Sequence, residues 1–313
     1  YGGFRGTGPN PDERDIEKYR TTLSGGPDNT TVGKAYHVFY HPAGLNLDET
    51  AILDGVTITG GGTGVKGGGM YNENNSPTLI NVTITGNEGS GMYNYYSNPT
   101  LINVVITKNK GYISGAGMYN YYSSPTLINV TITENESKNP GNPVHGGGMY
   151  NSYSNPTLTN VTITENFAAY DGGGMYNNGS NPILTNVLIA GNYTGWGSGG
   201  GMYNGNSSPI LTNVTISGNY ANSYGGGMYN GDSSPTLTNV TITGNDAFYG
   251  GGMYNENSSP ILTNVTISGN KADSNGGGLF NTLSSNPHIR NSIIYGNGPD
   301  DLHNEPDSNS EVS

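Results

Sequence analysis

Short alternations of apolar and polar residues run through most of the chain. In the Val-Thr-Ile-Thr run at 82–85 and in each equivalent segment, apolar residues alternate with Thr or Ser, and Gly, Asn or Pro ends the run after three to six residues. A period of two residues is typical of strands with one buried face, whereas the spacing of three and four residues that a helix needs does not recur. We therefore predict short strands joined by tight corners.

These runs belong to a repeat. All eight Met residues lie in the motif Gly-Met-Tyr-Asn, and residues 279–281 form a ninth copy. The motif's Met residues are Met70, Met92, Met118, Met149, Met175, Met202, Met228 and Met253. An Asn stands eleven residues after each Met, and a second Asn follows six residues later. Residues 53–59 are a partial earlier copy, so the chain holds about ten units.

Repeats of this length predict the architecture. One unit cannot bury an apolar face alone, but stacked units share a continuous core. The fixed intervals of eleven and six residues, next to a stretch of variable length, indicate rigid sides and one variable corner. We predict an all-β fold, a parallel β-solenoid of about ten coils. With neighbouring strands about 4.8 Å apart, the rod would be about 48 Å long.

The pattern also assigns the faces of each strand. We expect Met of the motif, Leu of Pro-Thr-Leu, and Val and Ile of Val-Thr-Ile-Thr to point inward as four apolar stacks, with Tyr and Thr outward. Asn suits the corners, because its short amide tolerates the left-handed conformation and can bond to the same Asn one coil away. Gly before each Met allows close approach of coils, and Pro fixes a turn.

The motifs Gly-Gly-Gly-Met-Tyr-Asn, Ser-Ser-Pro-Thr-Leu-Thr-Asn and Asn-Val-Thr-Ile-Thr-Gly-Asn resemble the right-handed parallel β-helix repeats of many secreted and surface-attached bacterial proteins. Residues 1–15 and 21–26 resemble the segment that precedes such repeats in that family. The repeats are also distantly similar to those of chlamydial polymorphic outer-membrane proteins. The resemblance covers nearly the whole chain and implies a right-handed β-helix in a secreted or cell-surface setting, but no reaction.

Three regions follow from the repeat boundaries. Residues 1–50 lack the repeat and are expected to cap the first coil, with 12–23 as a short amphipathic helix or an irregular cap. Residues 51–297 form the repeats. Residues 298–313 are an acidic tail that we expect to contact a neighbouring protomer, and 311–313 look like the start of another strand.

Composition narrows the classes of function. The chain has 313 residues, 11 Lys and Arg against 23 Asp and Glu, and no Cys. A net charge of -12 without a basic cluster disfavours nucleic acid as a partner. The lack of Cys excludes disulfides and thiol catalysis, and no apolar run reaches the roughly 18 residues of a membrane span. We expect no cofactor and no metal.

The Tyr residues of the motif are the first candidate binding surface. In a solenoid they line up as one outward column: Tyr71, Tyr93, Tyr119, Tyr150, Tyr176, Tyr203, Tyr229, Tyr254 and, in the ninth copy, Phe280. Such a stripe suits stacking on sugar rings or on a neighbouring rod. Tyr also favours strand surfaces for structural reasons alone, so both readings stay open.

Two further aromatic groups lie at the corners. Four adjacent loops at the variable corner carry pairs that we expect to form one strip: Phe167 and Tyr170, Tyr193 and Trp196, Tyr220 and Tyr224, Phe248 and Tyr249. A third group follows the motif in neighbouring coils and comprises Tyr95, Tyr96, Tyr121, Tyr122 and Tyr153. Contiguous exposed rings are typical of binding surfaces, and packing over Gly-rich backbone is the alternative.

Carboxylate chemistry has one weak candidate. Glu134 and Glu165 occupy the same place in successive coils, which would bring them about 5 Å apart, and Lys108 stands there one coil earlier. Such a pair suits acid-base catalysis or half a cation site. A solvated corner, in which Lys108 offsets one charge, is the plain alternative. The five His are scattered, so we assign them no site.

Two other patterns are weaker. Outward Thr pairs resemble the ice-binding faces of antifreeze proteins, but Val105, Leu188 and Ala190 interrupt them. Corner Asn residues match the glycosylation sequon because of the repeat geometry. Asn29 and Asn135, if they lie in loops, would be the better acceptors.

The function we predict is a non-enzymatic, extracellular structural or adhesive component of a cell surface or matrix that associates with itself, end to end or laterally. A polysaccharide-binding or polysaccharide-cleaving protein is the alternative, with the aromatic stripes as its surface. An ice-binding protein is a remote alternative.

Overall fold

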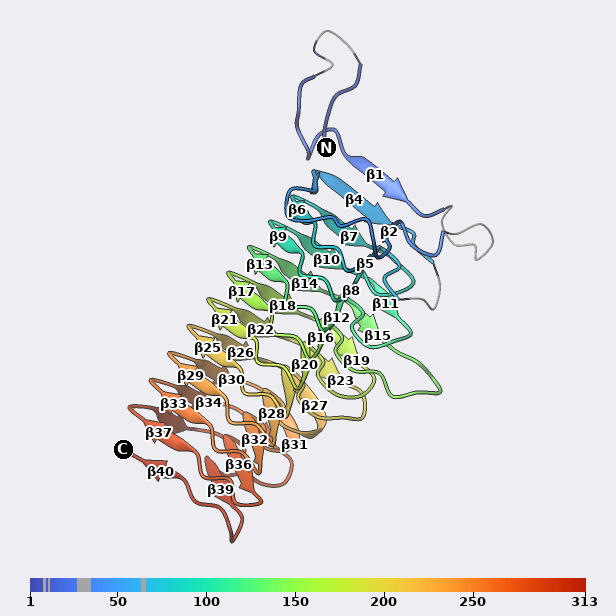
Figure 1. Ribbon diagram of the computed structural model, residues 1–313. Coiled ribbons are helices and arrows are strands. Elements are labelled where there is room, and N and C mark those ends of the chain that lie inside the picture. The colour runs from blue at the N-terminus through green and yellow to red at the C-terminus, as the bar shows by residue number, and fades with distance from the viewer. Residues whose placement is uncertain (8–9, 11, 27–34, 63–65) are drawn as a thin grey trace.

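The computed structural model describes residues 1–7, 10, 12–26, 35–62 and 66–313. Within these residues the secondary structure consists of strands β1 to β40, and no helix occurs. The strands stack as coils along a rod, with the two chain ends at opposite ends of it (Figure 1). The predicted all-β parallel solenoid is confirmed.

Each coil has three strand-forming sides. Over the described residues each side forms a parallel sheet of eleven strands, and equivalent residues of successive coils pair in register. The threonine sheet consists of β1 (Thr21–Ser24), β4 (Val56–Thr59), β7 (Thr83–Thr85), β10 (Val105–Thr107), β14 (Thr131–Thr133), β18 (Thr162–Thr164), β22 (Leu188–Ala190), β26 (Thr215–Ser217), β30 (Thr241–Thr243), β34 (Thr266–Ser268) and β38 (Ile293–Tyr295).

The motif Met-Tyr-Asn forms the second side. This tyrosine sheet consists of β2 (Phe39–His41), β5 (Met70–Glu73), β8 (Met92–Tyr95), β12 (Met118–Tyr121), β16 (Met149–Ser152), β20 (Met175–Asn178), β24 (Met202–Gly205), β28 (Met228–Gly231), β32 (Met253–Glu256), β36 (Leu279–Thr282) and β39 (Leu302–Asn304). The strand begins where the Gly run ends, so Gly flanks each of its Met residues on the N-terminal side.

The segment after each Pro forms the third side. This leucine sheet consists of β3 (Ile52–Asp54), β6 (Thr78–Ile80), β9 (Thr100–Ile102), β13 (Thr126–Ile128), β17 (Thr157–Thr159), β21 (Ile183–Thr185), β25 (Ile210–Thr212), β29 (Thr236–Thr238), β33 (Ile261–Thr263), β37 (His288–Arg290) and β40 (Glu311–Val312). A smaller corner sheet lies at the variable corner and consists of β11 (Lys110–Gly111), β15 (Glu136–Ser137), β19 (Phe167–Ala168), β23 (Tyr193–Thr194), β27 (Tyr220–Tyr224), β31 (Asp246–Tyr249) and β35 (Lys271–Ala272).

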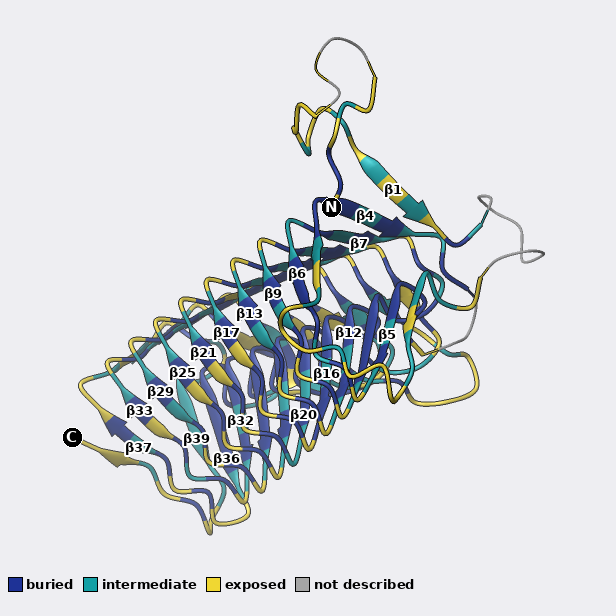
Figure 2. Ribbon diagram, turned by 45° about the horizontal axis from the view of Figure 1, so that its top comes forward, coloured by how far each residue is buried: buried dark blue, intermediate teal, exposed yellow. Residues whose placement is uncertain are grey.

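The core runs along the rod as the four predicted stacks. In one coil Met149, Leu158, Val161 and Ile163 are all buried, and the same positions are buried in the coils on both sides. Figure 2 shows how buried and exposed residues alternate along the strands. The hydrophobic driving force is therefore shared between coils, because each side chain packs on its copies above and below.

Asn residues link the coils at two places that the sequence predicts. The corner Asn adopts the left-handed conformation, with φ 55 at Asn160, and its amide donates to Asn129 Oδ1 at 3.1 Å. The closing Asn forms a second, buried ladder, in which Asn135 Nδ2 donates to Asn166 Oδ1 at 3.0 Å. Both ladders are confirmed.

A third ladder was not predicted. The Asn of Met-Tyr-Asn points into the rod, and Asn120 Nδ2 donates to Asn151 Oδ1 at 2.8 Å in a fully buried environment. Alternation places this Asn on the same face as the Met two residues before it, so the strand period alone indicates that it lies inside. Its repetition in every copy is the signal that it pairs with itself.

Carboxylates terminate two of the ladders. The corner amides donate toward the N-terminal end, where Asn81 Nδ2 donates to Asp54 Oδ1 at 3.0 Å, and Arg14 lies 2.7 Å from the same carboxylate. The closing amides donate toward the C-terminal end, where Asn297 Nδ2 donates to Asp301 Oδ1 at 2.9 Å. A carboxylate only accepts hydrogen bonds, so it satisfies the last amide donor.

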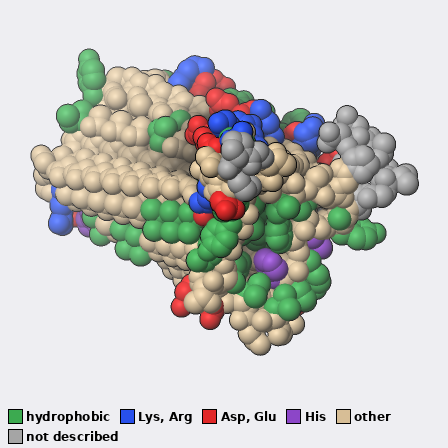
Figure 3. Space-filling model, turned by 90° about the horizontal axis from the view of Figure 1, so that it is seen from above, with side chains coloured by type: hydrophobic (Ala, Val, Ile, Leu, Met, Phe, Trp, Pro, Cys, Tyr) green, Lys and Arg blue, Asp and Glu red, His purple; other side chains and the backbone are tan. Residues whose placement is uncertain are grey.

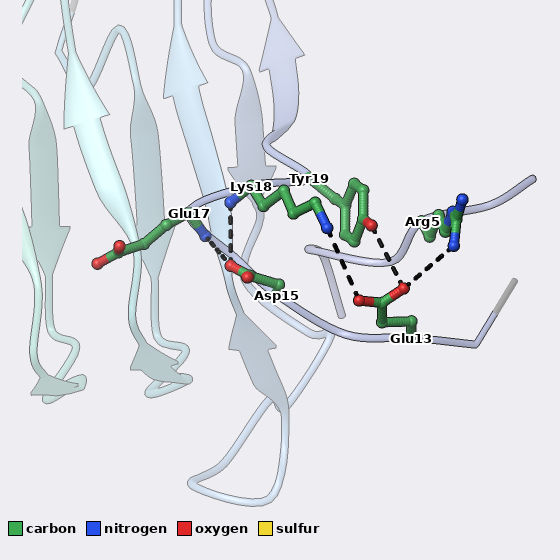
Figure 4. Close-up of polar contacts among 6 residues, drawn as sticks. All are labelled: Arg5, Glu13, Asp15, Glu17, Lys18 and Tyr19. Carbon is green, nitrogen blue, oxygen red and sulfur yellow. Dashed lines mark hydrogen bonds and ion pairs between the residues drawn. The ribbon is translucent and has the colours of Figure 1, made fainter. Parts of the chain in front are cut away.

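The N-terminal segment is irregular, and no helix forms at 12–23. Asp15 Oδ1 accepts hydrogen bonds from the backbone N–H groups of Glu17 and Lys18, which closes a turn, and Glu13 accepts from Arg5 and Tyr19 (Figure 4). The side-chain acceptor at Asp15 competes with helical bonding. β1 and β2 then pair with β4 and β5, so sheet strands already occur within residues 1–50.

The acidic tail folds onto the last coil. β39 pairs with β36, and β40 pairs with β37 through Glu311 opposite His288 and Val312 opposite Ile289. The strand expected at 311–313 is thereby confirmed. Contact of the tail with a neighbouring protomer stays a prediction.

Candidate functional site

A continuous column of aromatic rings lies on the tyrosine sheet. From Tyr71 to Phe280, ring centroids of successive coils are 4.6 to 5.6 Å apart. Sequence reasoning missed both extensions of this aromatic column: Tyr40 stacks on Tyr71 at 5.3 Å, and His303 stacks on Phe280 at 4.8 Å. Neither β2 nor β39 carries the motif, so the sequence does not indicate that these strands pair in register with β5 and β36.

The aromatic column is mostly covered. Tyr93 and Tyr229 are buried, and the other motif tyrosines are half-buried. Ring faces are occupied by the next ring of the column, and loop residues cover the outside, with Tyr224 4.8 Å from Tyr254 and His145 4.7 Å from Tyr176. A sugar ring needs a free aromatic face. The geometry therefore favours the packing reading for this column over the binding reading.

Burial sets the acidity of the column. It raises the pKa of Tyr71, Tyr93 and Tyr203 to about 12, with neighbouring tyrosines or carboxylates as lesser causes. Burial also raises the pKa of Tyr119, Tyr150, Tyr176, Tyr229 and Tyr254. These hydroxyls stay protonated at neutral pH, so they donate hydrogen bonds, as Tyr229 does to Glu256 Oε2 at 2.5 Å, and do not act as bases.

A second set of rings, which we call the tyrosine corner cluster, comprises Tyr95, Tyr96, Tyr121, Tyr122 and Tyr153. Tyr122 stacks between Tyr96 at 5.1 Å and Tyr153 at 5.0 Å. Tyr95 stacks on Tyr121 at 5.6 Å and meets Tyr96 edge to face. The sequence prediction that these neighbours lie together is confirmed.

The tyrosine corner cluster is both exposed and strained. Tyr96, Tyr122 and Tyr153 have φ 50, 48 and 51, and 42% to 54% of their surface is exposed. Most other coils place Asn, Asp or Gly at this left-handed position, the last motif copy places Leu283 there, and a Tyr costs about 1 to 2 kcal/mol. Strain of this kind is concentrated at functional sites, so the outlier points to a use for this corner.

The variable corner does not carry one continuous strip, which corrects the expectation. Phe167, Tyr193 and Tyr220 pair in register in the corner sheet, and Phe167 contacts Tyr193 at 4.8 Å. The second member of the later pairs turns away, because the loop leads into the tyrosine sheet: Tyr224 and Tyr249 pack on the aromatic column. Phe248 meets Tyr249 edge to face at 4.8 Å, and Tyr170 lies 6.1 Å from His145.

Trp196 differs from the other aromatic residues. Its side chain is 72% exposed, and it makes no ring contact with any described residue. A hollow of about 250 Å³ lies beside it, lined by Ala169, Tyr170 and the loop at 138–143. This loop belongs to the longest interval between successive motif Met residues, from Met118 to Met149. The longest insertion thus forms one wall of a depression whose other wall is the single Trp.

Backbone bonds fix the insertion loop at both ends. The N–H of Lys138 donates to the carbonyl of Gly111 at 2.9 Å, and the N–H of Tyr170 donates to the carbonyl of Val144, a buried residue, at 3.0 Å. Asn139 Nδ2 reaches the carbonyl of Tyr112 at 2.9 Å. The wall is therefore part of the coil structure rather than a free flap.

The two candidate carboxylates sit in successive coils, as predicted, at a left-handed corner with φ 55 each. Lys108 Nζ lies 3.6 Å from Glu134 Oε2, and both Glu134 and Glu165 are exposed. The described residues contain no group of three or more His, Asp or Glu able to hold a metal ion. The arrangement fits the solvated corner better than an acid-base pair.

The proposed glycosylation position at Asn135 is wrong. Asn135 is buried in the closing ladder, where its amide donates to the carbonyl of Ile106 and to Asn166 Oδ1, each at 3.0 Å. It occupies a regular repeat position rather than a loop. Asn29 lies outside the described residues. The outward Thr pairs are half-buried and interrupted at Val105, Leu188 and Ala190, as the sequence indicates.

Comparison with known families agrees with this geometry. Residues 142–297 match the family model described as right handed beta helix region. The repeat is a right-handed β-helix. The match begins inside the insertion loop at Asn142 and includes Tyr170, Trp196 and the later coils of the β-helix. No curated protein and no solved structure matched the chain.

The described part of the β-helix contains no helical segment long and apolar enough to cross a lipid bilayer.

Proposed function

We propose that this β-helix is a non-enzymatic, extracellular structural or adhesive component of a cell surface or matrix. The observation that carries the proposal is the exposure of aromatic rings at two corners of the rod on consecutive coils, above all Tyr96, Tyr122 and Tyr153. Holding large rings outside the core is typical of contact surfaces. The core and the Asn ladders do not need these rings, and the left-handed backbone at three of them costs stability.

The partners we propose are further copies of the chain, end to end or side by side, and glycans. In Figure 3, backbone and side chains that are neither charged nor hydrophobic form parallel rows along the face turned to the viewer. The leucine sheet adds exposed Ile183, Ile210 and Ile261 in the same outward column. Regular, sparsely charged faces suit contact with a second rod. The extracellular setting is supported by the resemblance of the motifs to repeats of secreted and surface-attached proteins.

Self-association is tested by sedimentation and electron microscopy over a concentration series. We expect the wild-type chain to form filaments or bundles at high concentration. A triple variant, Y96N, Y122N and Y153N, should remain more dispersed, because Asn keeps the left-handed corner that other coils use and removes only the rings. Isolated wild-type rods at every concentration would contradict the self-association.

A second candidate function is polysaccharide binding, which the exposed Trp196 beside a hollow favours. A glycan array measures binding, and a reducing-end assay measures cleavage. We expect binding without cleavage. Product formation that is lost in Glu165→Gln would instead support a hydrolase. No signal in either assay would contradict polysaccharide binding and cleavage alike.

A further inference from the structure

We propose that the hollow beside Trp196 is the saccharide-binding site of this β-helix and that it takes an uncharged sugar chain. The inference rests on the polysaccharide-binding function proposed above and adds its place and its ligand class. Four features of the described residues carry it: a free indole, a polar wall opposite, paired strand edges, and the charge of the molecule.

The indole has the free face that the aromatic column lacks. Trp196 is the only Trp of the chain and is 72% exposed. Its backbone is fixed, since its N–H donates to the carbonyl of Ala169 at 3.0 Å and its carbonyl accepts from Ser223 Oγ at 3.1 Å. A fixed backbone under a free ring is a preformed stacking platform, and the C–H face of a pyranose packs on such a ring.

The opposite wall offers polar groups. The insertion loop places Lys138, Asn139 and Asn142 along the hollow. Asn139 is used within the loop, because its Oδ1 accepts from the N–H of Gly141 at 3.1 Å. The side chain of Asn142 is exposed and bonds to no described residue. Its amide has two donors and an acceptor for sugar hydroxyls, which fixes the orientation that stacking alone does not.

An extended peptide is the poorer occupant. Peptides that bind β-proteins through their backbone add to a free strand edge. The strands next to this hollow, β19 and β23, are interior strands of the corner sheet and are paired on both sides. The hollow therefore presents side chains rather than a free ladder of backbone groups.

Charge argues against a polyanionic glycan. The chain carries a net charge of -12, which repels polyanions at long range. Lys138, the one cation lining the hollow, lies 3.9 Å from Glu136 Oε1, so its charge is already partly balanced. A neutral sugar chain meets no such penalty.

The platform extends along the rod axis. The ring of Phe167 lies against Gly195, the residue before Trp196, and pairs in register with Tyr193 and then Tyr220. Coils repeat about every 4.8 Å, close to the length of one sugar unit in an extended chain. We therefore place the sugar chain parallel to the axis, with successive units over successive coils.

The single Trp makes the test direct, because all indole emission of the protein comes from this site. Oligosaccharides of glucose, xylose and N-acetylglucosamine are titrated into the full chain, with Trp fluorescence and calorimetry read in parallel. We expect a saturable emission change with at least one neutral series. Trp196→Ala should weaken the calorimetric affinity at least tenfold, and Asn142→Ala should weaken it several-fold.

The matched control is Tyr295→Ala, which removes another highly exposed ring far along the rod and should leave the affinity unchanged. Circular dichroism confirms the fold of each variant. Binding by calorimetry that leaves the emission and the Trp196→Ala affinity unchanged would place the site elsewhere, so the inference would fail while the proposed function stands. Binding of only uronic or sulfated sugars would overturn the ligand class, and no binding of any sugar would overturn both.

Discussion

Asn is the residue that ties one coil to the next. Asn151 is fully buried, donates to Asn177 Oδ1 at 2.9 Å and accepts from Asn120 Nδ2 at 2.8 Å. Each amide in the ladder is both donor and acceptor, so a line of polar side chains runs through an apolar interior with every buried side-chain nitrogen and oxygen of the line hydrogen-bonded at least once. The same residue type at the exposed corner, such as Asn160, has mainly a backbone role, because it tolerates φ 55.

This difference predicts unequal losses on substitution. Asn151→Ala leaves a buried donor and a buried acceptor unsatisfied and should lower the free energy of unfolding by about 2 to 5 kcal/mol. The control in the same coil is Asn160→Gly, which keeps the left-handed corner and should cost less than about 1 kcal/mol. Urea unfolding followed by circular dichroism compares the two. Equal losses in the free energy of unfolding would contradict the conclusion that the inner ladder stabilises the fold more than the corner Asn does.

Part of the Asn ladder arrangement could be predicted from the sequence. The corner and closing Asn were predictable because eleven- and six-residue intervals bracket a strand whose faces are known. The ladder ends were not predictable. Asp54 and Asp301 stand outside the repeat, and only the direction in which the amides donate reveals that an acceptor is needed there.

At the scale of the elements, the Gly run sets how closely coils approach. A Cβ on Gly148 would lie 2.5 Å from the carbonyl oxygen of Gly174, in the backbone of the next coil. Gly218 has φ 60, and a Cβ there would meet nothing within 4 Å. Gly is therefore needed at 148 because the backbones of two coils approach closely there, and at 218 because the backbone is left-handed there.

Two alanine variants separate these requirements. Gly148→Ala forces neighbouring backbones apart and should cost about 3 kcal/mol or more. Gly218→Ala meets only the left-handed strain and should cost about 1 kcal/mol. Thermal melting ranks them, and a Gly218→Ala variant that melts below Gly148→Ala would contradict the packing argument.

The aromatic column predicts how stability depends on pH. Burial raises the folded-state pKa of Tyr71, Tyr93 and Tyr203 from the ordinary 10.0 to about 12. Between these values the folded chain holds protons that the unfolded chain has released, so the stability is fully present below pH 10 and falls as pH rises toward 12. Denaturant unfolding at several pH values measures the fall, and Tyr203→Phe should reduce its slope.

A flat stability profile from pH 9 to 12 would contradict the burial of the column. The sequence predicted that the column exists, but not that it is covered. The cover comes from loops that differ between coils, such as those bearing His145 and Tyr224, and no period constrains where such side chains turn.

At the scale of the whole molecule, the repeat period carries most of the information. Strand alternation, corner residues and coil spacing together predict one parallel rod, since each is satisfied only if equivalent residues stack. The structure of the N-terminal segment could not be predicted in this way, because the segment lacks the repeat. Asp15 forms a local turn where the sequence also allowed a helix. The Trp196 hollow could be predicted only in part, because the loop that lines its opposite wall occurs in one coil alone.

The same whole-molecule view separates scaffold from surface. Ladders and core stacks recur in nearly every coil, whereas the exposed, left-handed rings of Tyr96, Tyr122 and Tyr153 occur in only three adjacent coils. Features that recur along most of the rod are explained by stacking. Features confined to a few coils need a local reason, and contact with a partner supplies one.

The most direct test of in-register stacking is disulfide trapping in solution. Thr164 Oγ1 donates to Thr133 Oγ1 at 3.1 Å, and the two residues are backbone partners in successive coils, a geometry within reach of a disulfide. The chain has no other Cys. A Thr133→Cys, Thr164→Cys variant should oxidise within one chain, whereas Thr133→Cys with Ser217→Cys, three coils apart, should not. Failure of the first pair to close, or closure of both pairs alike, would contradict the stacked β-helix.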